Sequence, residues 1–280
     1  MGLGAISFLI IVANLIVSYN GFNNRRFYNS NVFQVEKILV RKEYKRLITS
    51  GFLHVNWWHL LFNMFTLYAF GNSLESYIGE LQYFLIYFAG LVGGNLLSLF
   101  IHRDHPDYRS VGASGAVAGV VFGSIALFPG MEIGFFGLPL SIPAWLYGLA
   151  YMLISIYGIK SRRDNIGHDA HLGGAMVGML IAILIQPSAL VQNYITILII
   201  SVPALAFLFI IIKRPQLLLV DNLFYRNHED FYSIDHKYNQ ERANRQREID
   251  RILEKIHKKG MKSLTREEKE LLKRQSKSIR

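Results

Sequence analysis

Cysteine is absent from the 280 residues of this chain, so disulfide bonds and metal sites built on thiolates are excluded, and the redox compartment stays open. Charged residues are also scarce, at 18% of the sequence. The zinc-protease pattern H-E-x-x-H does not occur. His168 and His171 have the spacing to share a metal ion, but no third ligand is clearly placed beside them. We therefore predict that the protein uses no metal and no cofactor.

Long apolar runs, in contrast, are abundant, and 51% of the residues are hydrophobic. A basic soluble protein of this size, with a net charge of +10, would not contain repeated apolar runs of about 18 or more residues. The runs predict an all-α polytopic membrane protein with a six-helix core and a seventh transmembrane helix. We expect core helices at about residues 3–19, 57–77, 81–101, 112–128, 144–159 and 170–185, and the seventh at 194–212.

The first run has neither a basic segment before it nor an obvious cleavage site after it. This pattern favours a retained helix, and a cleaved signal peptide is the alternative.

The composition changes after the seventh run, and most of the net positive charge lies there. We expect three parts: a six-helix membrane core at 1–190, the seventh helix at 191–213, and a basic linker with a soluble helical hairpin at 214–280. Thr265 and Glu268 have the spacing of a capping box within the hairpin. An apolar stripe at helical spacing precedes them, at Ile249, Ile252, Leu253 and Ile256. The tail is a solvated appendage, a dock for a partner, or a basic face for anionic lipid.

Four polar side chains stand out within the expected spans, where a polar group is costly and therefore indicates function. His59 and Asn63 share one face of the second helix, because they are four residues apart. Ser114 lies near the start of the fourth helix and His171 near the start of the sixth. The second, fourth and sixth helices cross in the same direction. At about 1.5 Å of rise per residue, the four groups therefore enter one leaflet at a similar depth.

Small residues indicate which of these helices touch. Glycines recur at helical spacing after Ser114 and after His171, at Gly115, Gly119, Gly174 and Gly178. Such stripes let membrane helices pack closely, which would bring Ser114 to His171. That pairing predicts a serine nucleophile activated by a histidine base.

The remaining groups have an expected role in this chemistry. His59 and Asn63 would donate hydrogen bonds to an oxyanion, and the backbone at Gly112 and Ser114 would complete the site. Alternatively, each group is structural, because a membrane serine often bonds to its own turn and an asparagine often joins helices. Asp169 points elsewhere on the helix than its neighbour His171, so we expect no acidic third member.

Three ordered motifs resemble those of the rhomboid family of intramembrane serine proteases: H-V-N-W-W-H-L-L-F-N at 54–63, G-A-S-G at 112–115 and A-H-L-G-G-A-M-V-G at 170–178. Glu75 and Gly79, after the second helix, also fit. The resemblance covers about residues 1–190.

This resemblance implies that Ser114 is the nucleophile and His171 the general base and acid. It implies an oxyanion site at His59 and Asn63, and a supporting structural role for His54. It further implies that the fifth helix and the loop 160–167 form a mobile gate and cap over the site. The implied substrates are transmembrane segments of other proteins, which are cut at small residues.

Two positions depart from the family pattern. The Trp-Arg pair of many members reads Lys45-Arg46 here. Many members also carry an aromatic residue four positions after the nucleophile, packed on the histidine ring, whereas this chain has Ala118. Another ring must then support the histidine, and the sequence offers Tyr147, Tyr151 and Phe122.

The expected partners are transmembrane substrates and the lipid bilayer, with no nucleic acid, and the oligomeric state stays open. The basic loops lie on the same side of the membrane as the expected active site, and the positive-inside rule would place that side in the cytoplasm. Resemblance to bacterial members implies the opposite, with an active site that opens to the periplasm. We expect a multi-pass protein of the bacterial inner membrane. The competing functions are a non-catalytic membrane adaptor or chaperone on the same fold and, with less support, a transporter.

Overall fold

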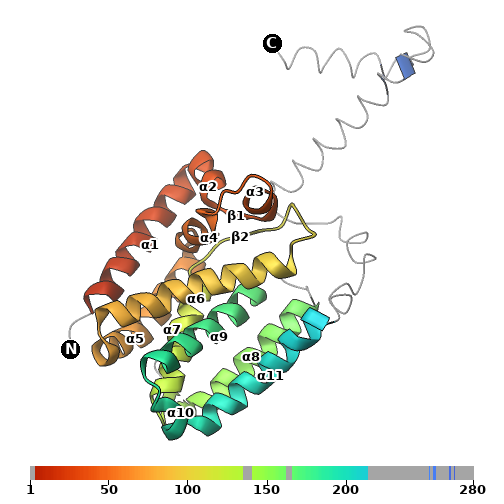
Figure 1. The fold of residues 1–280 in the computed structure, drawn as a ribbon. Helices are drawn as coiled ribbons and strands as arrows, with labels where there is room; N and C mark the ends of the chain where they lie inside the picture. The colour runs from red at the N-terminus through yellow and green to blue at the C-terminus, as the bar shows by residue number, and fades with distance from the viewer. Residues whose placement is uncertain are drawn as a thin grey trace. The chain divides into compact units, whose positions relative to one another are not determined.

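The computed structural model describes residues 4–134, 141–161 and 166–213, and beyond them only residues 252, 255, 256, 265 and 268. The chain divides into two compact units, Met1–Leu218 and Leu219–Arg280. The first unit is helical (Figure 1). Its long helices are α1 (Ala5–Asn23), α5 (Trp57–Ile78), α6 (Glu80–Ile101), α7 (Ser114–Leu127), α8 (Ala144–Ser161), α9 (His168–Ile185) and α11 (Tyr194–Lys213). The predicted all-α polytopic membrane fold is confirmed.

The helices differ in how readily they could cross a bilayer. By length and composition, α1, α6, α9 and α11 are long and apolar enough. The helix expected at 112–128 is shorter, because α7 has only 14 residues and begins at Ser114. Its length of about 21 Å falls short of a bilayer core of about 30 Å. Every residue of α7 after Ser114 is buried, so neighbouring helices, rather than lipid, surround it.

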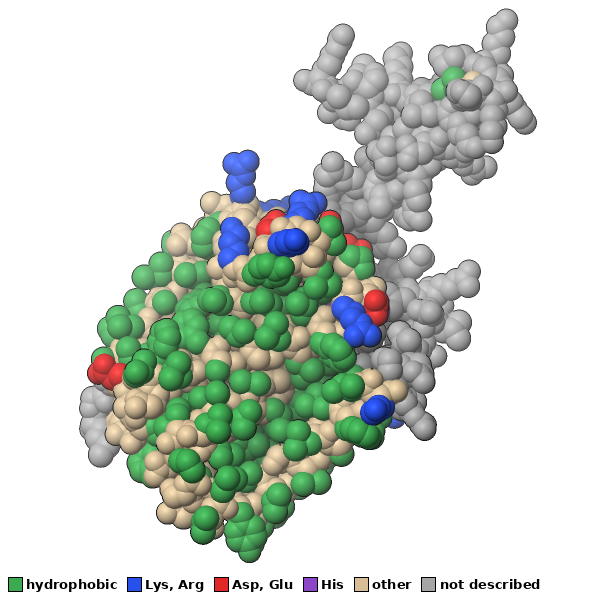
Figure 2. All heavy atoms as spheres, in the orientation of Figure 1, with side chains coloured by type: hydrophobic (Ala, Val, Ile, Leu, Met, Phe, Trp, Pro, Cys, Tyr) green, Lys and Arg blue, Asp and Glu red, His purple; other side chains and the backbone are tan. Residues whose placement is uncertain are grey.

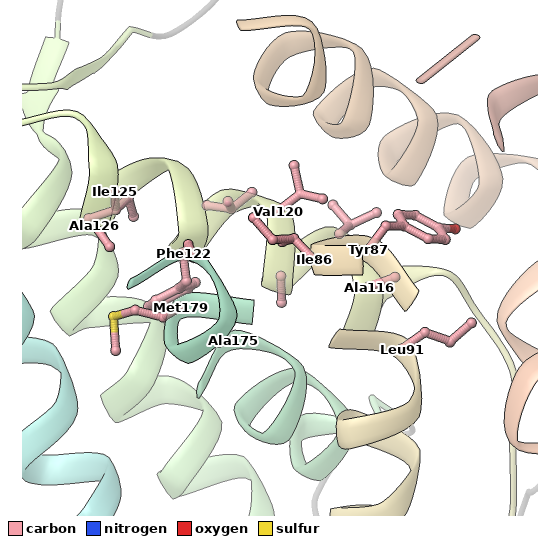
Figure 3. Packing of buried hydrophobic residues seen from close by; sticks show 14 of the residues in the cluster. Ile86, Tyr87, Leu91, Ala116, Val120, Phe122, Ile125, Ala126, Ala175 and Met179 are labelled. Atoms are coloured by element: carbon pink, nitrogen blue, oxygen red, sulfur yellow. The ribbon is translucent and has the colours of Figure 1, made fainter. Parts of the chain in front are cut away.

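Helix α7 packs between α6 and α9 through backbone contacts. A Cβ atom added to Gly119 would lie 3.1 Å from both the carbonyl oxygen of Gly174 and the Cα atom of Gly90. A side chain at Gly119 would force the neighbouring backbones to give by a few tenths of an ångström, so glycine here favours the close approach of the helices. Around this contact the side chains of the three helices interdigitate, as Figure 3 shows for Ile86, Tyr87, Val120, Phe122, Ala175 and Met179.

A buried carboxylate joins α1 to α5. Glu75, in the last turn of α5, accepts hydrogen bonds from the backbone N–H groups of Ile6 and Ser7, each at 2.8 Å. The hydroxyl of Ser7 donates to the same carboxylate at 2.6 Å. The negative charge lies at the amino end of α1, where the helix dipole and the unpaired N–H groups stabilise it. Helix α5 then ends at Gly79, whose φ of 91° suits glycine.

The connection between α1 and α5 is folded. It contains α2 (Arg25–Asn31), β1 (Phe33–Gln34), α3 (Val35–Leu39), α4 (Arg46–Thr49) and the 3₁₀ turn η1 (Ser50–Phe52). Strand β1 pairs antiparallel with β2 (Arg109–Ser110), just before α7. The buried guanidinium of Arg46 donates to Glu43 at 2.7 Å and to the carbonyl oxygen of Val32 at 2.6 Å. Figure 2 shows Lys and Arg side chains gathered at this end, and hydrophobic side chains over the face below.

The seventh helix, α11, packs along α8, and the two lie side by side in Figure 1. The side chain of Ile200 is fully buried and lies where Gly148 of α8 has no Cβ atom. Before α11, the amide of Asn193 donates to the carbonyl groups of Ile125 and Ala126, at 2.7 and 3.2 Å. These carbonyls end α7 and have no partner within it, so Asn193 caps that helix.

Short elements complete the first unit: a hairpin of β3 (Glu132–Gly134) and β4 (Ser141–Pro143), and α10 (Ala189–Gln192). Of the expected tail, the capping box is confirmed. The N–H of Thr265 donates to Glu268 at 2.7 Å, and the N–H of Glu268 donates to the Thr265 hydroxyl at 3.3 Å. Lys255 also pairs with Glu268 at 2.8 Å. Apart from Ile252 and Ile256, the rest of the predicted hairpin lies outside the described residues, as do residues 162–165 of the predicted cap.

Candidate active site

Three helices begin at the candidate site. Ser114 is the first residue of α7, His59 lies in the first turn of α5, and His171 lies in the first turn of α9. Asn63 lies one turn further along α5. The placement of these four groups near the starts of alternate helices is as predicted from their positions in the sequence.

Gly112 brings the His59 ring beside Ser114. Its φ of 136° is unfavourable for residues with a side chain. A Cβ atom there would lie 2.7 Å from Cε1 and 3.0 Å from Nε2 of His59, and 3.5 Å from the Ser114 hydroxyl oxygen. The ring and the hydroxyl therefore border the same small volume. The N–H of Gly112 donates to the carbonyl oxygen of Ser50 at 3.1 Å, which fixes this turn.

The backbones next to Ser114 and His171 are in contact. A Cβ atom on Gly115 would lie 3.1 Å from the carbonyl oxygen of Ala170, the residue before His171. One turn later, a Cβ atom on Gly174 would overlap the backbone of Gly115. The next pair down, Gly119 and Gly178, meets in the same way. The two glycine stripes thus bring α7 and α9 together as predicted, with Ser114 and His171 at adjoining helix starts.

An aromatic ring lies beside His171 despite Ala118. The ring centroids of Tyr151, from α8, and His171 are 5.9 Å apart, and the rings are inclined at 33°. Tyr151 in turn contacts Phe122 at 5.4 Å and Tyr147 at 6.0 Å. Of the three candidates in the sequence, Tyr151 is in ring contact with the histidine.

A cavity of about 150 Å³ opens beside Ser114 between α5, α7 and α8. Asn63 also lines it, and so does Ala118, whose small side chain leaves the space open. The other lining residues are almost all apolar or aromatic: Phe62, Thr66, Val117, Val121, Phe122, Tyr147 and Tyr151. The cavity has the chemistry to hold part of an apolar peptide next to the hydroxyl.

The two expected oxyanion donors have different hydrogen bonds. One N–H of the Asn63 amide donates to the carbonyl oxygen of His59 at 2.9 Å, which leaves its second N–H for a ligand. The Nδ1 atom of His59 is buried, and no hydrogen bond to it is found within the described part of the chain. A buried nitrogen lone pair without a hydrogen bond costs less free energy than a buried N–H without one. The proton of His59 is therefore expected on Nε2, the ring nitrogen that faces Gly112.

His54 supports the turn before Ser114. It lies outside the membrane helices and is buried, and its ring is 4.9 Å from that of His59. Its Nδ1 contacts the hydroxyl of Ser18 at 2.8 Å, and its Nε2 accepts the N–H of Ala113 at 3.4 Å. Burial, and secondarily the charge of His59, lowers the pKa of His54 to about 3, so the ring is neutral.

Asp169 is turned toward a different histidine. Its Oδ2 lies 3.2 Å from Nε2 of His102, and its Oδ1 accepts the Tyr108 hydroxyl at 3.5 Å. The His102 and Tyr108 rings are stacked, with centroids 3.5 Å apart. Asp169 therefore joins the end of α6 to the start of α9. No group of three metal-ligating side chains is found among the described residues.

Sequence reasoning missed Ser18 and His102. Ser18 is one small polar residue near the end of an apolar run, and its contact partner is 36 positions away. His102 lies in a charged loop, where a histidine needs no explanation. Neither residue stands out without the tertiary contacts.

Comparison with known proteins identifies relatives of both units. The family described as "Rhomboid domain" matches residues 41–188, and a family of unknown function (DUF6576) matches residues 232–278. The chain is 35% identical over 155 residues to Rhomboid protein 1, mitochondrial, of Saccharomyces cerevisiae, covering 53% of this chain and 45% of that protein. It is 31% identical over 144 residues to the putative rhomboid protease YdcA of Bacillus subtilis, covering 51% and 67% respectively.

A further bacterial relative is the rhomboid protease AarA of Providencia stuartii, with 29% identity over 182 residues, 58% of this chain and 62% of that protein. The chain spans about half the length of the first curated relatives it matches, between 45% and 55%.

Proposed function

The chain belongs to the rhomboid family, and on that premise we propose that it is a serine endopeptidase that cleaves transmembrane segments of other membrane proteins. The observation that carries this proposal is the contact of Gly115 with Ala170, because these residues adjoin Ser114 and His171 at the starts of α7 and α9. A reactive serine needs a base within reach, and few other pairings in a membrane interior provide one.

In the proposed reaction, the Ser114 oxygen attacks the scissile carbonyl carbon while its proton passes to His171. The tetrahedral intermediate collapses, the C–N bond breaks, and His171 gives the proton to the leaving amine. Water then attacks the acyl-enzyme while His171 accepts its proton, and His171 returns that proton to the Ser114 oxygen as the ester bond breaks and the carboxylic acid product leaves. No acidic third residue takes part, since Asp169 faces His102.

The oxyanion of the intermediate would be held beside Gly112. The donors are Nε2 of His59, the free amide N–H of Asn63, and the N–H of Ser114, which has no acceptor within its own helix. The amino end of α7 adds a favourable dipole. Losing one such donor typically lowers the rate by about 10²–10³-fold.

The cavity beside Ser114 supports an apolar substrate segment, because its lining matches the side chains of a membrane helix. We assign the protease to residues 1–190 and regard the seventh helix, at 191–213, and the tail, at 214–280, as additions to it. The protein is a multi-pass membrane protein, and a bacterial inner membrane is the location we propose for it.

The proposal is tested with the full chain in liposomes that contain a model transmembrane substrate. We expect Ser114→Ala and His171→Ala each to lower cleavage to less than about a thousandth of the wild-type rate. Ser124→Ala is the matched control, because this buried serine of the same helix only bonds to the carbonyl oxygen of Val120 in its own turn. It should leave the rate nearly unchanged.

A serine-directed fluorophosphonate gives an independent readout that needs no substrate. It should label the wild type and Ser124→Ala but neither Ser114→Ala nor His171→Ala. A wild-type protein that neither reacts with this reagent nor cleaves would be a membrane adaptor instead of a protease.

A further inference from the structure

A buried hydroxyl of α1 contacts the machinery around Ser114 although α1 itself lies away from the nucleophile. Ser18 is fully buried, and its hydroxyl oxygen is 2.9 Å from the carbonyl oxygen of Phe52 and 2.8 Å from Nδ1 of His54. His54 is also buried, and its Nε2 faces the N–H of Ala113. A chain of contacts thus runs from α1 to the residue before Ser114.

Only one arrangement of protons satisfies all three contacts. The single hydroxyl proton of Ser18 must go to the carbonyl oxygen of Phe52, because that atom can only accept. The Ser18 oxygen is then an acceptor for His54, so the His54 proton lies on Nδ1. This tautomer leaves Nε2 bare, as it must be to accept the N–H of Ala113. The opposite tautomer would place two N–H groups against each other.

The segment around His54 holds two consecutive amides before the nucleophile. The carbonyl oxygen of Ser50 accepts the N–H of Gly112 at 3.1 Å, and His54 accepts that of Ala113 at 3.4 Å. The next N–H along the chain belongs to Ser114, the first residue of α7, and the first N–H groups of a helix have no acceptor within it. The direction of this N–H decides whether it can reach an oxyanion.

We propose that Ser18 is a positioning residue for the reaction: it fixes the tautomer of His54, which in turn holds the Ala113 amide and orients the start of α7. This inference rests on the proposed protease function. Loss of the Ser18 hydroxyl frees His54 to exchange its proton between nitrogens, and the turn from Gly112 to Ser114 loses one of its two fixed points.

Helix α1 provides a matched control. Ser7 is, like Ser18, a fully buried serine of α1, but its hydroxyl donates to Glu75 at the other end of the helix. Ser7→Ala and Ser18→Ala therefore remove the same atom from equally buried places in one helix. Both should lower stability, whereas only Ser18→Ala should change the chemistry.

We would measure kcat and KM in liposomes, the rate of fluorophosphonate labelling, and the ¹⁵N NMR signals of His54 in histidine-labelled full-length protein, assigned with a His54→Gln variant. For Ser18→Ala we expect kcat and the labelling rate to fall about 10–100-fold with KM little changed, since small misplacements of reacting groups have effects of this size. For Ser7→Ala we expect both rates to stay within about twofold of the wild type. The wild type and Ser7→Ala should show His54 protonated on Nδ1, and Ser18→Ala should show a mixture of tautomers.

Equal losses of kcat in the two variants would overturn the proposal while leaving the protease function intact. Wild-type His54 protonated on Nε2 would overturn it as well, whatever the activity. A wild type without Ser114-dependent cleavage or labelling would instead overturn the protease function, and with it any part of Ser18 in a reaction.

Discussion

The two faces of α7 are built on opposite principles. Toward α9, glycine lies against glycine, and a Cβ atom added to Gly178 would overlap the backbone of Gly119. Toward α5 and α8, the side chains of α7 border a cavity of about 150 Å³ that includes Ser114. At Gly178 the contact with α7 leaves no room for a methyl group, whereas the face of α7 toward α5 and α8 leaves room for part of a ligand.

The difference fits two requirements of the proposed protease function. The nucleophile and its base need a fixed distance, and backbone-to-backbone packing provides it because a helix backbone has no rotamers to change. A substrate needs space beside the same hydroxyl, and small residues such as Ala118 on the other face leave that space. We call the side of α7 that packs on α9 the closed face, and the side that borders the cavity the open face. The comparison leads to three predictions: one on the closed face, one at Gly112 just before α7, and one on the open face.

The largest effect is expected where the closed face is tightest. Gly178→Ala places a methyl group into the backbone of Gly119, so α7 and α9 must separate. We expect a loss of at least about 3 kcal/mol in the free energy of unfolding, measured in mixed detergent micelles, together with loss of cleavage. Gly123→Ala is the control, because its methyl group would meet the Ala182 side chain at 3.3 Å, where a small shift suffices. Equal losses in both would show that the tight contact of Gly178 with Gly119 is not what sets the spacing of α7 and α9.

An intermediate effect is expected at Gly112. Gly112→Ala should lower kcat about 100-fold, because its methyl group would displace the His59 ring from the oxyanion site. Gly130→Ala separates this effect from backbone strain. Gly130 also has a positive φ, 73°, but nothing lies within 4 Å of its added Cβ atom. Both variants should lose about 1–2 kcal/mol of stability, and only Gly112→Ala should lose activity. Unchanged kcat in Gly112→Ala would argue against His59 as a donor.

The smallest effect is expected on the open face, at Tyr151. Tyr151→Ala removes the ring beside His171 and should lower the rate of fluorophosphonate labelling about threefold to tenfold, the usual worth of one aromatic contact. Tyr151→Phe keeps the ring and should react at nearly the wild-type rate. If the phenylalanine variant is as slow as the alanine variant, the hydroxyl group matters, and the ring contact is not the cause.

Much of the site could be predicted because its information is local. Apolar runs mark the membrane helices, and the positions of Ser114, His59 and His171 within those runs predict a common depth. The glycine stripes predict which helices meet. The catalytic roles of Ser114, His59 and His171 stay predictions.

Other features could not be predicted, because their partners lie far apart in the chain. Ser18 and His54 are 36 positions apart, and their contact depends on the path of the whole connection between α1 and α5. The later start of α7, at Ser114 instead of residue 112, likewise follows from the turn at Gly112. A pattern of apolar residues does not predict the backbone conformation of that turn.

The sequence by itself determined the order of the long apolar helices and the positions of the polar groups near the starts of α5, α7 and α9, because both depend on local composition and spacing. Only the tertiary structure decided that Tyr151 is a ring beside His171, that Asp169 faces His102, and that the Ser18 hydroxyl contacts His54. Those pairings depend on which side chains face each other after the helices pack, and spacing along one helix carries no information about the rotation of the next.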